Sequence, residues 1–407
     1  MLKPIPEWRW IKVCLLFFLI TSQGWTQTNR LSDSLFLQSK IEWNTKFEGG
    51  ASANSFAFIK PFVYGGFITP EQIFSEWSQL NPINSAGGFA ETELSYRFTN
   101  SNKQSFRWSY AEYLTGSITF SRDLFDLVFR GNLNKNMYEL SPGQFNLSRF
   151  KSLFFETLRY RKSRWTFQFG IGGILGNRNI QAQLLPNSRL DNTLPEQSLC
   201  MYLNARYQSS GINLNNSNQI NGFGLGLRAF CETALDSVWK ISAGIRNLGL
   251  LGWHQNLNVR QWDTLLYWSG ISPQSLGSDS IETPWLALSA QPNNSNASYL
   301  TPLPAEIHLE CVRTNLQGIE TIRAGLQYRF IPAYLPLIYT EHYFGKGFVN
   351  PSFFLAYGGF SQTQYGFGLR GRYKGCFLEI QGRALQNFIF KNSPLAFHLT
   401  TQLCFVF

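Results

Sequence analysis

The last twelve residues of the chain, AFHLTTQLCFVF at positions 396–407, alternate between two kinds of side chain. The odd positions are mainly large and apolar, and they run from Phe397 to Phe407. The even positions are mainly polar or small, and they include His398 and Gln402. Successive side chains of a β-strand point to opposite faces of its sheet, so this period of two predicts a strand with one apolar face.

The same alternation recurs upstream, in residues 90–98, 165–171, 222–229, 239–246, 322–330, 365–373 and 378–384. A soluble β-sandwich has the same period, but these segments approach the 9–11 residues of a transmembrane strand, and aromatic residues lie at their ends. The chain also stops on an aromatic residue, Phe407. We therefore expect an all-β chain that forms a transmembrane antiparallel β-barrel of about 14 strands, within a range of about 12–16.

Composition favours the barrel over a soluble domain. Aromatic residues make up 16% of the chain, and charged residues make up only 15%, against roughly 25% in typical soluble domains. The net charge is +10, but the basic residues do not cluster as they would in a nucleic-acid site, so we expect no nucleic-acid partner. The partners that we expect are outer-membrane lipid, other envelope proteins, and the barrel assembly machinery, whose recognition signal the strand ending at Phe407 resembles.

The first 26 residues have the order of a secretory signal peptide. Lys3, Arg9 and Lys12 precede the apolar run 13–20, and small or polar residues follow it. The alternative, an anchoring helix, would need about 20 apolar residues. We predict a cleaved signal peptide over residues 1–26, a barrel over residues 27–407, and a place in the outer membrane of a Gram-negative bacterium.

The connections between the expected strands include three long polar loops, near residues 184–198, 209–219 and 272–299. Residues 121–130 have helical spacing, with Ser121 as the N-cap and Asp123 in the first turn, which predicts a short helix that caps or plugs the barrel. Residues 27–60 are less regular, and we expect them inside the lumen.

The expected inward faces carry many arginines, because a cation facing lipid at mid-membrane costs about 2–4 kcal/mol. The candidates for the lumen are the basic residues Arg97, Arg206, Arg228, Arg246, Arg323, Arg329, Arg370, Arg372 and Arg383 with Lys240, and the acids Glu91, Glu93, Glu310 and Glu379. One interpretation is a basic lumen that favours anionic solutes. The other is a filled interior in which arginines pair with acids and loop carbonyls.

Catalytic and cofactor motifs are few. His308 and His342 are expected in neighbouring strands, but no G-x-S-x-G surrounds any serine, and no metal-binding or phosphate-binding motif is present. The glycines of GFGLG at 222–226 alternate with apolar residues in a strand and precede no helix, so they do not indicate a dinucleotide site. Five cysteines follow the signal segment, and we expect either small apolar residues on strand faces or one cross-strand disulfide.

Three segments resemble a family of Bacteroidota outer-membrane barrels that has no assigned function and is grouped with FadL-like barrels. LFDLVFRGN at 124–132 resembles the family's short helix that ends in Gly-Asn. WKISAGIRNLGLLGW at 239–253 resembles its strand and turn, with Asn247 in place of the usual Asp, and YLTPLP at 299–304 resembles the start of a later strand. The resemblance implies a barrel without established catalytic residues, in a wider group that includes channels for hydrophobic molecules and PorP/SprF-like membrane proteins of type IX secretion.

The leading hypothesis is a non-enzymatic barrel without a cofactor, which acts as a channel or transporter for small or hydrophobic solutes or as a structural component of the envelope. A membrane subunit of a secretion or surface-assembly complex is the second hypothesis. The third is an outer-membrane lipid-modifying enzyme that uses a serine and a histidine at the rim.

Overall fold

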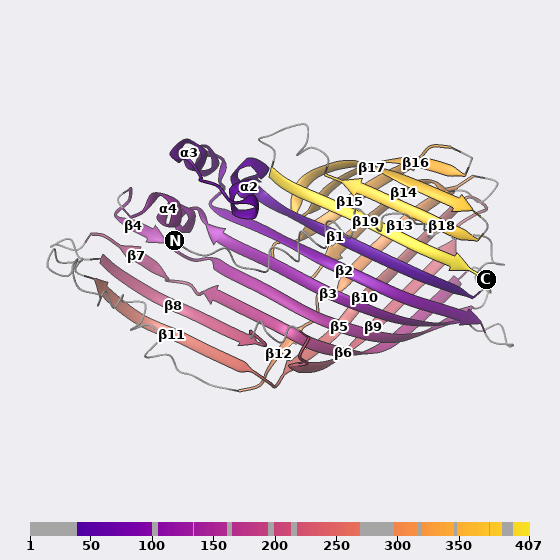
Figure 1. Ribbon diagram of the computed structural model, residues 1–407, viewed down its shortest axis with the longest axis horizontal. Coiled ribbons are helices and arrows are strands. Elements are labelled where there is room, and N and C mark those ends of the chain that lie inside the picture. The colour runs from indigo at the N-terminus through magenta and orange to yellow at the C-terminus, as the bar shows by residue number, and fades with distance from the viewer. Residues whose placement is uncertain are drawn as a thin grey trace.

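The computed structural model describes residues 39–99, 105–132, 134–160, 165–193, 199–212, 218–268, 297–315, 320–345, 348–373, 375–384 and 394–407. Within them the chain forms an antiparallel barrel that is longer on one side, with three short helices at one end (Figure 1). The predicted signal peptide over residues 1–26 lies outside the described residues.

Fourteen strands close the barrel, so the predicted architecture is confirmed in the described part of the chain. In order around the wall they are β1 (Lys40–Ser55), β2 (Ile83–Thr99), β3 (Ser105–Ser121), β5 (Gly143–Tyr160), β6 (Trp165–Leu184), β9 (Gly222–Ala234), β10 (Trp239–Trp253), β13 (Glu306–Thr314), β14 (Glu320–Arg329), β15 (Leu335–Tyr343), β16 (Val349–Gly359), β17 (Ser361–Tyr373), β18 (Cys376–Arg383) and β19 (Pro394–Val406).

The barrel closes between the first described strand and the last. β1 pairs with β19 from Lys40 opposite Val406 to Gly50 opposite Ala396. Residues 40–55 are thus part of the wall, and the expectation that residues 27–60 lie inside the lumen is wrong for them. Glycine and small polar residues fill the second half of this strand, which weakens its apolar alternation in the sequence.

The two ends of the barrel differ in their connections. At the end that carries Phe407, β9 joins β10 through residues 235–238 and β17 joins β18 through residues 374–375. At the other end, β1 joins β2 through residues 56–82 and β3 joins β5 through residues 122–142. Bacterial barrels have short periplasmic turns and long extracellular loops, so we assign the end with the long connections to the cell exterior.

One sector of the wall continues beyond the closed barrel. The first part of β6 pairs with β9 as far as Gly176 opposite Gly222, and its last residues pair instead with β8 (Leu199–Ser210). β8 pairs in turn with β11 (Leu257–Trp268), whose other side pairs with no described strand. The short strands β4 (Met137–Glu139), β7 (Arg189–Asp191) and β12 (Tyr299–Pro302) complete this extracellular extension and the rim beside it.

Three helices cover the extracellular end next to β1–β3 (Figure 1). They are α2 (Phe56–Tyr64), α3 (Pro70–Gln79) and α4 (Arg122–Arg130). α4 confirms the helix predicted at 121–130, because the Ser121 side chain accepts a hydrogen bond from the Leu124 amide, as an N-cap does. Phe58, Leu80 and Phe125 form a small apolar core between the helices.

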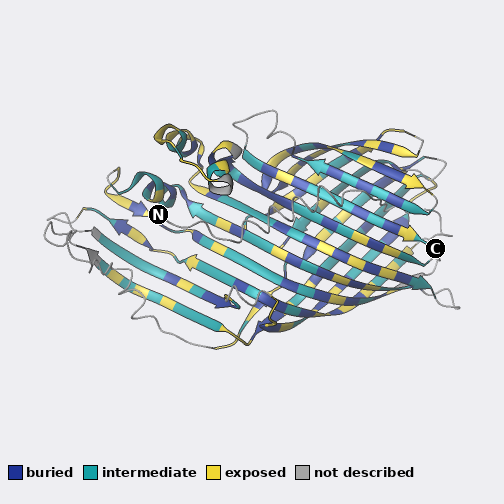
Figure 2. Ribbon diagram, in the orientation of Figure 1, coloured by how far each residue is buried: buried dark blue, intermediate teal, exposed yellow. Residues whose placement is uncertain are grey.

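The outward face of the closed barrel is apolar. Along many strands of the barrel in Figure 2, buried residues alternate with intermediate or exposed ones, and the large apolar residues that are exposed are aromatic or aliphatic. On β19, Phe397 is 50% exposed, whereas His398 is 8% exposed, so the two faces predicted for the last strand are confirmed. No helix among the described residues is long and apolar enough to cross a membrane.

Candidate functional site: the charged interior

Two carboxylates on β2 form the centre of the lumen, the space that the fourteen strands enclose. Glu91 and Glu93 are 3% and 2% exposed, and they alternate with the outward side chains of Thr92 and Leu94. A carboxylate that is removed from water is costly unless cations or hydrogen-bond donors surround it. This pair therefore depends on charges that other strands supply.

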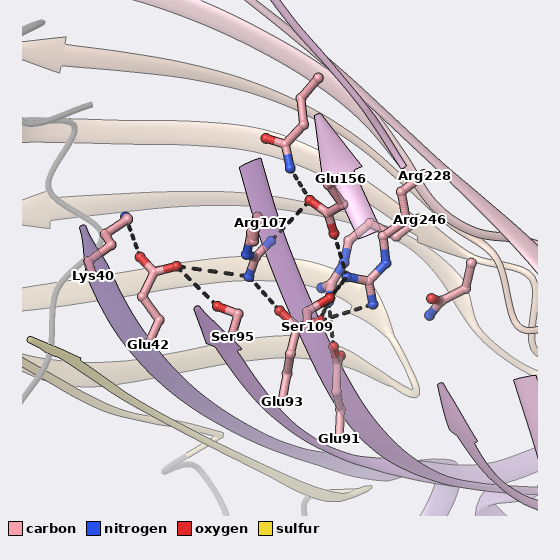
Figure 3. Close-up of polar contacts among 12 residues, drawn as sticks. Lys40, Glu42, Glu91, Glu93, Ser95, Arg107, Ser109, Glu156, Arg228 and Arg246 are labelled. Carbon is pink, nitrogen blue, oxygen red and sulfur yellow. Dashed lines mark hydrogen bonds and ion pairs between the residues drawn. The ribbon is translucent and has the colours of Figure 1, made fainter. Parts of the chain in front are cut away.

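Three arginines from three other strands supply those charges (Figure 3). Arg107 of β3 lies 2.6 Å from Glu93, and Arg228 of β9 lies 3.0 Å from it. Arg246 of β10 lies 2.6 Å from Glu91 and 3.2 Å from Glu93. β3, β5 and β6 separate β2 from β9 along the wall, so Arg228 and Arg246 reach β2 through the lumen.

Arg228 is enclosed by further groups that fit a guanidinium. It donates hydrogen bonds to Glu156 of β5 at 2.8 Å, to Ser109 at 3.0 Å and to the Tyr113 hydroxyl at 3.0 Å. Its Cζ atom lies 4.0 Å from the centre of the Phe154 ring. Planar, bidentate hydrogen bonding together with stacking on an aromatic ring is characteristic of arginine, and lysine would reproduce neither.

Glu156 of β5 also binds two arginines. It lies 3.4 Å from Arg107 as well as 2.8 Å from Arg228, and it also accepts a hydrogen bond from Gln168. Toward the periplasmic end, Lys40 pairs with Glu42, which extends the same chain of charges. Together these residues form a charged layer across the lumen, and this layer contains both acids and bases rather than a ring of cations.

A further arginine crosses the whole lumen. Arg329 of β14 lies 4.0 Å from Glu91 and 2.6 Å from Glu306, and its Cζ atom lies 3.5 Å from the centre of the Phe89 ring on β2. Six strands separate β2 from β14 in either direction around the wall, so the two strands are diametrically opposite. Among the described residues, it is side chains that close the barrel along this diameter.

A separate cluster lies at the periplasmic end, on the side of β14 to β18. Arg370 lies 2.7 Å from Glu320 and 2.9 Å from Glu379, and it donates to the Tyr343 hydroxyl at 2.8 Å. Arg323 pairs with Glu320 at 2.8 Å. This part of the interior also neutralises its arginines with carboxylates.

A fully buried carboxylate lies beside that cluster. Glu341 is 1% exposed and accepts hydrogen bonds from Ser352 and Gln381, each at 2.7 Å. Arg383 lies nearby, with its Cζ atom 3.5 Å from the centre of the Phe354 ring. Polar and aromatic side chains therefore fill this sector of the lumen together.

An apolar layer lies on the extracellular side of the charged one. Its buried residues come mainly from β3, β5, β6 and β10, and they are Ala111, Tyr113, Phe150, Phe154, Ile174, Leu251, Trp253 and Leu303. A bulge in β10 between Ile245 and Leu248, where Asn247 has φ 54°, reverses the alternation of that strand and turns Leu251 and Trp253 inward. The Trp253 indole donates to Thr301 at 2.9 Å, so its polar atom is satisfied.

The turn between β16 and β17 folds into the lumen and narrows it further. Phe360 packs with Phe89, Ile331 and Tyr334 in a buried cluster. It lies against Gly87 of β2, where an added Cβ would be 2.3 Å from the ring. A glycine at this position is what allows the turn to reach β2, which β18, β19 and β1 separate from β17 along the wall.

The structure brings most of the predicted lumen residues into these clusters. Arg228, Arg246 and Arg329 meet at Glu91 and Glu93, Arg323 and Glu379 belong to the Arg370 cluster, and Arg97 is buried on β2. The geometry matches the interpretation of an interior in which arginines pair with acids, and it does not match a uniformly basic lumen.

Arg206 lies outside the closed barrel, and Arg372 lies at the periplasmic end of β17, on the same face as Arg370 and in register with buried Phe377. Arg206 is exposed on β8, which is not a strand of the closed barrel, so its assignment to the lumen is corrected. The Arg372 side chain is exposed, and its Cζ atom lies 5.1 Å from the centre of the Phe377 ring. The prediction also missed Arg107 and Glu156, although the alternation of β3 and β5 was present in the sequence to indicate their inward faces.

The groups considered for catalysis are dispersed. His308 lies on β13 and His342 on β15, so β14 separates them and they are not on neighbouring strands as expected. The five cysteines that follow the predicted signal segment are free thiols, so the structure has no cross-strand disulfide among them. Among the described residues, no three His, Cys, Asp or Glu side chains are grouped so as to hold a metal ion.

The similarity of the chain to known proteins is low. No protein-family model matches the chain, and no curated protein matches it in sequence. The chain is similar to solved toluene transporters. The Pseudomonas putida transporter TodX is 8% identical with a TM-score of 0.44, and 94% of each chain is covered.

Two further solved structures have comparable scores. The Ralstonia pickettii toluene transporter TbuX is 8% identical with a TM-score of 0.45, over 93% of this chain and 92% of that one. A Pseudomonas aeruginosa FadL homologue is 10% identical with a TM-score of 0.44, over 91% of this chain and 89% of that one. At these scores the likeness assigns no activity and no role to any interior residue.

Proposed function

We propose that the protein is a non-enzymatic outer-membrane channel for small or hydrophobic solutes, and that the arrangement described above is its closed form. The outward face supports the membrane location, because exposed side chains such as Leu225 (68%) and Phe367 (63%) suit contact with lipid rather than water. Closed barrels are one of the two structures that satisfy every backbone hydrogen bond within lipid.

The observation that carries the proposal is that side chains close the described lumen. Arg228, Arg246 and Arg329 span it by ion pairs to β2, and neither a helix nor a strand crosses it among the described residues. Rotamer changes are enough to break such contacts, whereas a folded plug would have to move as a unit. The apolar layer around Trp253 provides a surface for hydrophobic solutes on the extracellular side.

Single-channel recording in planar bilayers tests the proposal, with the wild type and a Glu91→Gln/Glu93→Gln variant. Removing two carboxylates leaves the arginines around them without counter-charges, so we expect the variant to open more often and to favour anions. The reciprocal variant Arg228→Gln/Arg246→Gln should open more often and favour cations. A reversal between anion and cation selectivity in the two variants would show that the current passes through the barrel and not through a damaged bilayer.

Glu71→Gln is a matched control, because this carboxylate is exposed on α3 and lies outside the lumen. Its current should equal that of the wild type. If the wild type and both interior variants carry no current, and if none of them lets a hydrophobic solute enter liposomes, the protein is not a channel.

The extracellular extension favours a second candidate, a membrane subunit of a surface-assembly complex. Among the described strands β11 pairs with β8 on one side, and a strand at the end of a sheet can pair with a strand from a partner. A photo-crosslinking residue at exposed Gln261 should then give one stoichiometric adduct in intact cells. The same group at Ser237, at the periplasmic end, should give no adduct. If neither position gives an adduct, the assembly role is rejected and the channel function remains the proposal.

A further inference from the structure

Polar side chains cover the inner face of the sheet at the extracellular end of the barrel. The strands β3, β5, β6, β8 and β11 are paired there in a continuous sheet, and residues in register share one face of it. The outer row of this face has one polar residue on each strand: Thr119, Gln144, Gln183, Arg206 and Gln261. The next row toward the lumen continues the pattern with Ser117, Asn146, Gln181 and Gln208. We call these two rows the polar wall.

The polar wall faces the axis of the barrel rather than lipid. Ser117 is in register with Gly87 of β2, and Gly87 lies against the Phe360 ring inside the lumen. On β11, Leu257 lies on the same face as Gln261 and packs against the apolar layer. The polar wall therefore continues the inner surface of the barrel beyond the apolar layer, toward the cell exterior.

Two residues of the outer row have hydrogen-bonding groups that are available to a ligand. Gln183 and Gln261 are exposed, and neither side chain forms a hydrogen bond within the described part of the chain. Each amide offers two N–H donors and a carbonyl acceptor. Adjacent strands lie about 4.8 Å apart, so the five polar residues of the row extend over about 19 Å.

The charge of this surface is close to neutral. On the described inner face of the five strands, beyond the apolar layer, the charged side chains are Arg206 and Asp263, and both are exposed. A single cation does not suit a polyanion, and a hydrophobic solute would leave the amides without partners. A neutral saccharide carries hydroxyl groups along its whole length, and each hydroxyl both donates and accepts, as the amides do.

An aromatic ring borders the polar wall on its lumen side. Asn179 lies on the inner face of β6, one row below Gln181, and donates to the Tyr299 hydroxyl at 3.1 Å. The Tyr299 ring is half-buried against the apolar layer. A pyranose ring has an apolar C–H face and a rim of hydroxyl groups, so an aromatic ring beside rows of amides matches both parts.

We propose that the polar wall binds a neutral oligosaccharide from the cell exterior. The sugar chain lies across the strands, its hydroxyl groups bond to Gln183 and Gln261, and the end of the chain nearest the lumen packs on Tyr299. Binding requires no movement of the ion pairs inside the lumen, so the site is independent of whether the barrel conducts.

A glycan array tests the proposal, with the barrel purified in a detergent that contains no sugar. The probes are neutral glucans, mannans, galactans and xylans, each beside a sulfated counterpart. The wild type should retain at least one neutral chain and should bind its sulfated counterpart more weakly. For that chain, Gln183→Ala/Gln261→Ala should weaken binding about thirtyfold, because each hydrogen bond of ordinary strength contributes about fivefold. Gln79→Ala removes an exposed amide on α3, outside the polar wall, and should bind like the wild type.

A reversible block separates a binding role from a folding defect. Gln183→Cys, modified after folding by a bulky methanethiosulfonate, should lose the glycan and should regain it when the mixed disulfide is reduced. The wild type and Ser237→Cys, treated in the same way, should keep the glycan, which controls for the five native thiols. An array without any retained neutral glycan, equal binding of the sulfated counterpart, unchanged binding by the double variant, or a loss that reduction does not restore would each overturn the proposal.

Discussion

Buried charges hold the interior together, and Arg228 binds two of the buried carboxylates at once. Arg228→Met keeps an unbranched side chain of similar reach but leaves Glu93 and Glu156 without a cation that lies within 3.0 Å of both. Breaking a buried pair from one side costs about 3–5 kcal/mol, so we expect the free energy of unfolding to fall by about that amount. Urea unfolding in detergent, followed by tryptophan fluorescence, measures the change.

Arg206→Met is the matched control for that measurement, since the Arg206 side chain is exposed on β8. Its effect should stay within about 0.5 kcal/mol, as for most surface substitutions. Equal losses in the two variants would show that the interior ion pairs contribute nothing beyond an average arginine.

The contact between Gly87 and Phe360 makes a second prediction at this scale. Gly87→Val places a side chain where the ring now lies, and we expect a loss of about 1–3 kcal/mol from overpacking. Adding Phe360→Ala to Gly87→Val should recover part of that loss, because the truncated side chain leaves room for valine. The four unfolding free energies of this double-mutant cycle measure the coupling.

Gly173→Val is the control, since an added Cβ at that position meets no atom within 4 Å. It should be neutral or slightly stabilising, because valine suits an exposed strand better than glycine does. Independent, additive effects of Gly87→Val and Phe360→Ala would refute the packing of the turn against β2.

At the scale of residues, the alternation of the sequence gave the face of a side chain but not its partner. Glu91, Arg228 and Arg329 were expected to face inward because neighbouring positions are apolar. That they meet one another depends on which strands oppose each other across the lumen, and that depends on strand order and tilt. No local pattern encodes this information.

Among the elements, the strands with regular alternation and the capped helix α4 were predictable, and β1 was not. The extension was also missed, because β8 and β11 lie between long polar loops and neither belongs to the closed wall. A second limit is the bulge in β10, where one extra residue reverses the faces, so that Leu251 and Trp253 point inward although the pattern before it places odd residues outward.

The layer of helices gives a prediction at this scale. Glu76 of α3 is 4% exposed and accepts hydrogen bonds from the amide and hydroxyl of Ser55, the N-cap of α2. Glu76→Gln weakens both bonds, so amide hydrogen exchange over residues 56–80 should accelerate by about tenfold, which corresponds to about 1.4 kcal/mol. Exchange in β13 to β18 should not change.

Gln79→Ala is a suitable control because Gln79 is exposed at the end of the same helix. It should leave exchange in α2 as in the wild type. If Glu76→Gln behaves like Gln79→Ala, the carboxylate does not hold the two helices together.

For the whole molecule, the assignment of the two ends can be tested by labelling. Phe67 is 97% exposed between α2 and α3, and Ser237 is exposed in the turn between β9 and β10. In intact cells, a bulky maleimide that does not cross the outer membrane should label Phe67→Cys and should not label Ser237→Cys. After permeabilisation of the outer membrane, both should react.

The wild type is the reference for background labelling, because it already carries five free thiols in strands. Labelling of Ser237→Cys in intact cells, without labelling of Phe67→Cys, would invert the assigned orientation of the barrel.

The architecture as a whole followed from the sequence because each strand carries its own apolar face, and a sheet of such strands in lipid must close. The shape of the barrel's cross-section could not be predicted from the sequence. Strand number fixes the circumference of the wall, and a circumference is compatible with a round opening or a flattened one.

The bridge from Arg329 to Glu91 and Phe89 selects between these shapes. It draws two opposite strands to within the combined length of one arginine and one glutamate, and at a constant circumference the barrel must then widen along the other diameter. The width available to a solute is therefore governed by the length of a side chain, so replacing that single arginine would change the calibre of the molecule without altering one backbone hydrogen bond of its wall.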